Sequence, residues 1–157
     1  MEADSAAAVE AASAGAGQAV AGNALRLTRR QHRRVVRSVE RAERTTGTQF
    51  CVYLGPTTED PRAHAEAMFE EAKLHTRPAI LVLVAPEGKR VEVVTSAEMR
   101  SRVSDRTCSE VIEAMAGYFA RSDIAGGIVA GIQQLETAVG PSSEGPPTGP
   151  FPDFIEE

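Results

Sequence analysis

The stretch Ile80-Leu81-Val82-Leu83-Val84 is an unbroken apolar run, flanked by Ala79 and Ala85. At that length it predicts a strand that is buried on both faces. A strand of this kind needs a layer of structure on each side, because neither face can be left in water. The run therefore favours a sheet covered by helices on both faces.

Two further strands are predicted around this run, at Gln49–Leu54 and at Arg90–Thr95. The first is apolar on both of its alternating faces, and the second returns after a turn at Pro86-Glu87-Gly88-Lys89. Helices are predicted over 28–44, 60–75, 107–121 and 123–139 from their caps and apolar spacing. The start of the third helix is predicted from a capping box, Thr107-Cys108-Ser109-Glu110. The fold class is α/β, with helices on both sides of a small mixed sheet.

The chain of 157 residues fits one domain with a segment at each end. Residues 1–24 are rich in Ala, Gly and Ser and are predicted to be disordered, because they bury too little apolar surface. The domain is predicted to span 25–140. Residues 141–157 form a Pro/Gly-rich acidic tail. Its apolar patch Phe151-Pro152-Asp153-Phe154-Ile155 is expected either to dock back on the domain or to bind a partner.

Composition excludes several classes of protein. The N-terminus carries Glu2, Asp4 and Glu10 in place of the basic region of a signal peptide, and no apolar run is long enough for a membrane span. These features predict a soluble, cytoplasmic protein. Cys51 and Cys108 do not form a disulfide framework, and we interpret them as buried apolar residues or free thiols.

Several segments, taken in order, carry a resemblance to a known family. The motifs are Val39-Glu40-Arg41-Ala42-Glu43-Arg44-Thr45-Thr46-Gly47, Ala79–Ala85, Lys89-Arg90-Val91-Glu92-Val93-Val94, Val103-Ser104-Asp105 and Phe119-Ala120-Arg121-Ser122-Asp123-Ile124-Ala125-Gly126-Gly127-Ile128. This succession, over about 25–139, resembles the TPM domain family. It is most similar to soluble actinobacterial members with no assigned function.

The resemblance implies a three-layer α/β/α sandwich. Plant members of the family serve photosystem repair and have been credited with acid phosphatase activity, and some members bind divalent cations in an acidic cleft. By resemblance, Asp105 and Asp123 fall on the acidic positions, so calcium or magnesium is the implied cofactor. The sequence departs from the family at Thr95 to Met99, where a glycine-containing loop is usual, and it lacks the acidic residue upstream of the first helix.

The residues themselves leave alternatives open for each site. Asp105 and Asp123 supply two oxygen ligands only if two helix starts converge, and otherwise each is a helix cap. Arg100, Arg102 and Arg106 could hold an anion or simply face solvent. Segment 26–44 carries eight arginines against Glu40 and Glu43, which permits polyanion binding or a solvated charged face.

The leading functional prediction is a non-enzymatic TPM-like accessory or interaction domain with a protein partner. No nucleophile elbow, metalloprotease helix or phosphate-binding loop is present in the sequence. The alternative is a weak divalent-cation-dependent acid phosphatase. A second alternative is polyanion binding through the arginine-rich helix, although nucleic acid is not the favoured partner, because aromatic residues for base stacking are few.

Overall fold

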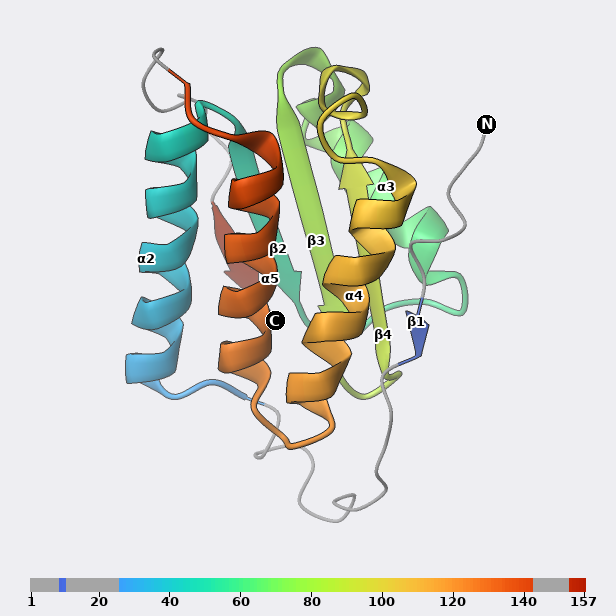
Figure 1. Cartoon of the computed structure of the whole chain (residues 1–157). Coiled ribbons are helices and arrows are strands. Elements are labelled where there is room, and N and C mark those ends of the chain that lie inside the picture. The colour runs from blue at the N-terminus through green and yellow to red at the C-terminus, as the bar shows by residue number, and fades with distance from the viewer. Residues whose placement is uncertain (1–8, 11–25, 143–152) are drawn as a thin grey trace.

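The computed structural model describes residues 9–10, 26–142 and 153–157. Within them the chain forms a three-layer α/β/α sandwich, as the sequence predicts (Figure 1). The helices are α2 (Arg29–Thr46), α3 (Pro61–Glu71), α4 (Asp105–Phe119) and α5 (Ile124–Val139). The strands are β1 (Val9–Glu10), β2 (Gln49–Leu54), β3 (Ala79–Ala85), β4 (Arg90–Thr95) and β5 (Phe154–Glu156). Short 3-10 turns occupy Leu74–Thr76 and Ala97–Met99.

The sheet is mixed and has the strand order β1-β4-β3-β2-β5. Strand β3 pairs in parallel with β2, with Val82 opposite Val52, and antiparallel with β4, with Val82 opposite Val93. Every residue of β2 and β3 is buried, as predicted from their continuous apolar character. The chain passes from β2 to β3 through α3, which is the crossover that a parallel pair needs.

Two apolar cores lie on opposite faces of the sheet. The larger core joins Phe50, Val52, Ile80 and Val82 to helices α2, α4 and α5. The smaller core joins Cys51, Tyr53, Leu81 and Leu83 to α3 and the turn that follows it. Because side chains alternate along a strand, neighbouring residues of β2 and β3 supply the two cores in turn. One thin layer of backbone therefore holds both halves of the domain together.

The helix boundaries follow local capping chemistry. Thr28 and Gln31 form a capping box at the start of α2, and Gly47 ends that helix in the left-handed conformation, so α2 lies close to the predicted range 28–44. The predicted cap at Thr107 is wrong by one turn. The Ser104 hydroxyl accepts the hydrogen bond from the Thr107 N–H, so α4 begins at Asp105. Ser104 and Thr107 both carry a hydroxyl that can cap a helix. Which of them caps α4 depends on the position in which the preceding 3-10 turn leaves the chain.

Both terminal segments contribute to the sheet. Val9 and Glu10, within the stretch predicted to be disordered, pair with Val91 and Arg90 at the outer edge of β4. Phe154–Glu156, from the predicted tail, pairs in parallel with β2 at the other edge. Strand addition uses backbone hydrogen bonds, so a short segment of ordinary composition can join an edge. Of the predicted docking patch, Phe151 and Pro152 lie outside the described residues.

Glycines in α5 allow α4 to approach closely. A Cβ atom on Gly127 would overlap the Phe119 ring and lie 3.0 Å from the Tyr118 Cβ atom. A Cβ atom on Gly131 would lie 2.6 Å from the Met115 sulfur. A Cβ atom essentially never lies within 3.0 Å of a non-bonded heavy atom, so the side chains of Phe119 or Met115, or the helices themselves, would have to shift to admit larger residues there.

Replacing one of these glycines should therefore destabilise the protein, whereas replacing a glycine in open space should not. We expect Gly127→Ala to lower the free energy of unfolding by about 1–3 kcal/mol, because the Phe119 ring must move. Gly117→Ala is the matched control, because nothing lies within 4 Å of its added Cβ atom. That change should raise stability by about 0.5–1 kcal/mol through helix propensity. Urea unfolding curves test both, and equal effects would contradict the close packing.

Candidate interaction surface

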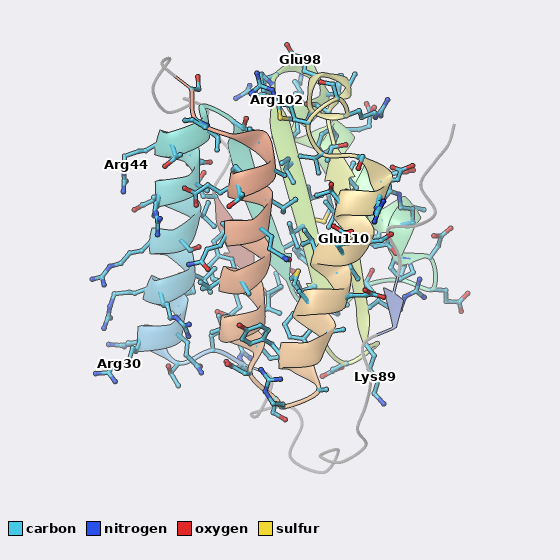
Figure 2. The ribbon with its side chains drawn as sticks, viewed as in Figure 1. Arg30, Arg44, Lys89, Glu98, Arg102 and Glu110 are labelled. Carbon is cyan, nitrogen blue, oxygen red and sulfur yellow. The ribbon has the colours of Figure 1, made fainter. Side chains whose placement is uncertain are left out.

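The outer face of α2 is strongly basic (Figure 2). The arginines of segment 26–44 are all exposed, at Arg26, Arg29, Arg30, Arg33, Arg34, Arg37, Arg41 and Arg44. Among the described residues, Arg41 alone of this set has an ion pair, with Glu136 at 3.8 Å. We call the exposed arginines of α2 the basic face. It is a concentrated positive charge on a protein whose net charge is −5.

One of the two acidic residues predicted to interrupt this face is not on the surface. Glu43 is only 7% exposed and points under the helix, where its carboxylate accepts a hydrogen bond of 3.0 Å from the Phe50 N–H. Burial raises the pKa of Glu43 to about 8, against the lowering effect of the Phe50 bond. The carboxyl group of Asp153 lies beside it, and its pKa is also raised, mainly by burial. At neutral pH Glu43 is therefore largely uncharged, and Glu40 is the one exposed acid within α2.

The C-terminal segment lies between α2 and β2, where Asp153 meets Glu43; we call these two residues the acid pair. The Val52 N–H donates to the Asp153 carbonyl at 3.0 Å, and the Glu157 N–H donates to the Leu54 carbonyl at 2.8 Å. The Phe154 ring packs on the larger core, with its centroid 4.7 Å from that of the His32 ring. The Glu156 carboxylate accepts a hydrogen bond of 3.0 Å from the Leu27 N–H. We call the site that this segment fills, formed by the outer edge of β2 at Val52 and Leu54 together with Leu27 and His32, the edge groove.

The two predicted cation ligands are not brought together. Asp105 occupies the first turn of α4, whereas Asp123 is the N-cap of α5 and accepts the Gly126 N–H at 2.9 Å. Helices α4 and α5 run in opposite directions side by side, so these two starts lie at opposite ends of the domain (Figure 1). A 15-residue helix separates them by roughly 22 Å. In the described part of the chain, no three His, Cys, Asp or Glu side chains are grouped to hold a metal ion. Calcium or magnesium binding at Asp105 and Asp123 stays a prediction.

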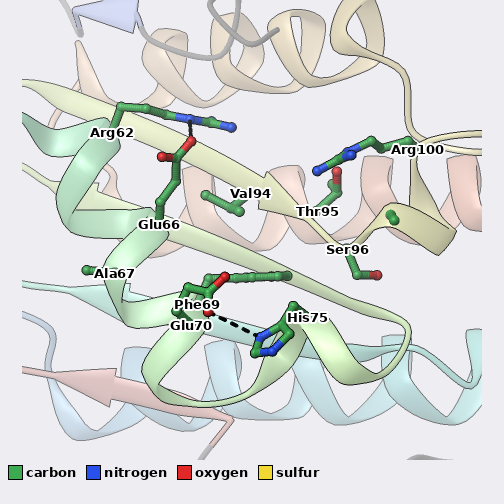
Figure 3. A pocket seen from close by; sticks show the side chains of 11 residues that line it. Arg62, Glu66, Ala67, Phe69, Glu70, His75, Val94, Thr95, Ser96 and Arg100 are labelled. Atoms are coloured by element: carbon green, nitrogen blue, oxygen red, sulfur yellow. Dashed lines mark hydrogen bonds and ion pairs between the residues drawn. The ribbon is translucent and has the colours of Figure 1, made fainter. Parts of the chain in front are cut away.

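The three arginines predicted as an anion site also diverge. Arg102 donates to the Val139 carbonyl at 3.2 Å, and Arg106 pairs with Glu110 at 3.2 Å on the surface of α4. Arg100 lines a depression of about 430 Å³ between α3 and the end of β4 (Figure 3). Phe69 and Val94 also line it. The arginines therefore act separately.

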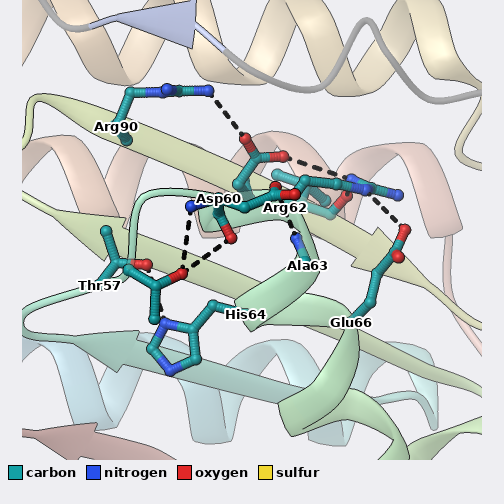
Figure 4. Close-up of polar contacts among 10 residues, drawn as sticks. Thr57, Asp60, Arg62, Ala63, His64, Glu66 and Arg90 are labelled. Carbon is teal, nitrogen blue, oxygen red and sulfur yellow. Dashed lines mark hydrogen bonds and ion pairs between the residues drawn. The ribbon is translucent and has the colours of Figure 1, made fainter.

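A polar network lies over β4 on the side of α3 (Figure 4). Arg62 donates to the Val93 carbonyl at 2.8 Å and to the Glu66 carboxylate at 2.9 Å. Glu92 is fully buried between Arg62 and Arg90, each 3.6 Å away. Burial raises the pKa of Glu92 to about 7, although both arginines favour its charged form. This network was not predicted from the sequence. The one sign of it there is Glu92, an acid within an otherwise apolar strand.

The remaining nucleophilic groups are poorly suited to catalysis. Cys51 and Cys108 are buried, as predicted, and belong to different cores. Burial raises the pKa of the Cys51 thiol to about 12 and of the Cys108 thiol to about 11, which disfavours the reactive thiolate form. The Thr57 hydroxyl lies 2.8 Å from Nδ1 of His64 (Figure 4). The Tyr53 ring packs on this imidazole edge to face, and no described acid within ion-pair distance orients it, so the pair lacks the third group of a catalytic triad.

The layers, the mixed sheet and the helix order define the class of protein, which is a three-layer α/β/α domain with a basic helix on one flank. Over the described ranges 9–10, 26–142 and 153–157, no helix combines the length and the apolar character that crossing a bilayer requires. The family model of the TPM domain matches residues 20–138, so the chain belongs to the TPM domain family, as its motifs predicted.

Two solved structures share the fold. One is the BA42 protein of the psychrophilic bacterium Bizionia argentinensis, with a TM-score of 0.72 and 21% identity over 83% of this chain and 95% of that one. The other is the N-terminal domain of a protein from P. gingivalis, with a TM-score of 0.65 and 15% identity over 73% of this chain and 77% of that one. At these identities the likeness concerns the fold alone.

The raised pKa of Glu43 predicts how the stability of the protein depends on pH. The folded-state pKa of Glu43, about 8, exceeds the value of about 4.3 expected when the chain is unfolded, so the folded state holds its proton more tightly. The free energy of unfolding should therefore fall as pH rises from about 4.5 to 8 and level off above that range. Glu43→Gln keeps an acceptor for the Phe50 N–H without the charge, so it should remove the decline between pH 7 and 8 and stabilise by roughly 1–3 kcal/mol at pH 9.

Glu92→Gln is the matched control for this experiment. The pKa of Glu92 is raised to about 7, so its own contribution to the decline is largely complete by that pH. Urea unfolding at pH 5, 7, 8 and 9 should show the decline between pH 7 and 8 in the Glu92→Gln variant and not in the Glu43→Gln variant. The same decline in both variants would show that Glu43 is not the group responsible.

Proposed function

We propose that this chain is a non-enzymatic accessory domain of the bacterial cytoplasm, and that its basic face binds an acidic segment of a partner protein. The observation that carries the proposal is the charge on α2. Seven of its residues are exposed arginines, and Glu40 is its one exposed acid, because Glu43 is buried. Arginine presents five donors in a fixed planar fork, which suits carboxylate groups.

The described surface favours an acidic protein segment over nucleic acid. Helix α2 carries no Phe, Tyr or Trp, so it offers no platform for stacking an unpaired base. Among the described residues, Asp153, Glu156 and Glu157 make no ion pair with the basic face, so most of its arginines are open to an acidic partner. Electrostatic attraction of this kind raises the rate of association and falls with added salt.

Charge neutralisation tests the role of the basic face. The variant Arg30→Gln/Arg33→Gln/Arg37→Gln should bind a labelled 20-residue polyglutamate peptide at least ~10-fold more weakly than the natural chain at low salt. The control Lys89→Gln/Arg100→Gln/Arg106→Gln removes the same charge from other surfaces and should change binding less than ~2-fold. Fluorescence anisotropy at 50 and 200 mM salt measures both.

Two results would contradict this assignment. Equal loss of peptide binding in both triple variants would mean that net charge alone is sensed. Tighter binding of a 20-base-pair DNA duplex than of the peptide, lost in the α2 variant, would make nucleic acid the ligand of this face.

The absence of catalysis is tested separately with p-nitrophenyl phosphate in the presence of calcium or magnesium. Support for a non-enzymatic role comes from the buried cysteines and from the separation of Asp105 and Asp123. We expect no hydrolysis above that of a preparation carrying both Asp105→Ala and Thr57→Ala. Divalent-dependent hydrolysis that either substitution abolishes would instead favour a weak phosphatase.

A further inference from the structure

The edge groove is occupied by the chain's own C-terminal strand, and this strand is held less firmly than the central strands β2 and β3. Strand β5 has three residues, all half-buried, whereas β2 and β3 are buried throughout. Its apolar anchors are two half-buried side chains, Phe154 against the larger core beside His32 and Ile155 against the smaller core. A short strand with only half-buried anchors can exchange with a competing strand at a modest cost in free energy.

The segment that leads to this strand is long enough to let it leave. The Ser142 N–H donates to the Thr45 carbonyl at 2.8 Å, so the chain passes from α5 to the last turn of α2. It returns to the same helix, where Asp153 faces Glu43. The ten residues between, 143–152, include four prolines and two glycines and could span roughly 33 Å when extended. Release of β5 therefore need not disturb α5.

The groove also shows what kind of segment fits it. The edge of β2 offers backbone groups at Val52 and Leu54, which pair with an extended segment whatever its sequence. The ring of His32 and the adjoining core accept an aromatic side chain. The Leu27 N–H donates to a carboxylate two positions after that aromatic residue, so an acid there is preferred over an apolar side chain, which offers this donor no partner. Asp153, at the start of the strand, lies beside Glu43, so the preference for an acid is set at the position of Glu156.

We propose that the edge groove is a binding site for an extended acidic segment of a partner protein, which enters as a strand parallel to β2, and that the C-terminal strand occupies the groove until it is displaced. The required pattern is an aromatic residue followed two positions later by an acid, as in Phe154 and Glu156. This inference rests on the proposed function, since it names where on the α2 flank the acidic partner is held.

The acid pair gives the groove a dependence on pH. The groups that face Glu43 are Glu40 on its own helix, Cys51 on β2 and Asp153 at the start of the C-terminal strand. All of these are neutral or acidic, so loss of a proton from Glu43 or Asp153 places unbalanced negative charge between α2 and β5. Alkaline conditions therefore favour release of the strand, and Glu43→Gln opposes it.

The test uses full-length variants and a labelled peptide, Pro-Asp-Phe-Ile-Glu-Glu, which copies residues 152–157. Phe154→Ala removes one apolar anchor of the resident strand, and Ile155→Pro removes the other anchor together with a backbone donor. Because a tethered strand competes at an effective concentration on the order of millimolar, each variant should bind the peptide at least ~10-fold more tightly than the natural chain. The peptide with Phe154→Ser should bind at least ~10-fold more weakly than the unaltered peptide.

Each outcome decides the proposal. Failure of the peptide to bind either variant, when circular dichroism shows both to be folded, would overturn it, as would equal binding to all three proteins. A natural chain that sediments as a dimer and becomes monomeric in the Phe154→Ala variant would overturn the choice of occupant in favour of a second copy. Adding Arg30→Gln/Arg33→Gln/Arg37→Gln to Phe154→Ala separates the two proposals. If the peptide still binds, the groove stands and the role of the basic face fails.

Discussion

The burial of β3 on both faces is the constraint on which the rest of this fold depends. A strand with no polar side chain from Ala79 to Ala85 is stable only if apolar layers cover it above and below. Helices α2, α4 and α5 supply one layer and α3 supplies the other. The parallel partner β2 is buried in the same way, and α3 is both the crossover to β3 and the cover of the second face. The second face of the sheet is therefore covered mainly by one short helix, α3.

The parts of the fold that depend on local periodicity could be predicted from the sequence. The central strands, the hairpin to β4, the cap at Thr28 and the stop at Gly47 all follow from residue types at fixed spacing. The α4 cap was misplaced because Ser104 and Thr107 offer equivalent hydroxyls one turn apart. Family motifs identified the family, but they could not show that Asp105 and Asp123 lie at opposite ends of antiparallel helices. That fact belongs to the tertiary arrangement.

The edge groove could be predicted only in outline. A three-residue strand carries almost no pattern of its own, and Phe154–Glu156 pairs because the edge of β2 offers backbone partners. The role of Glu43 was equally hidden. It stands beside Arg44 in an otherwise basic helix, which suggests a surface position, but it lies four residues after the buried Val39 and so shares the inward face of α2.

The carboxyl group of Glu43 links the two surfaces of the α2 flank. Because Glu43 lies under the helix, the basic face has little opposing charge. The Glu43 carboxylate also accepts the Phe50 N–H, which lies on the edge of β2 just before the pairing with β5 begins. Its neighbour Asp153 leads into the strand that fills the edge groove. A charge on Glu43 would therefore act on both surfaces at once, since it would weaken the contact with Asp153 and reduce the positive potential of α2. A glutamine at position 43 would keep the hydrogen bond but could not become charged, so it would remove this coupling. The charge state of one buried acid therefore affects both the occupancy of the edge groove and the charge of the basic face.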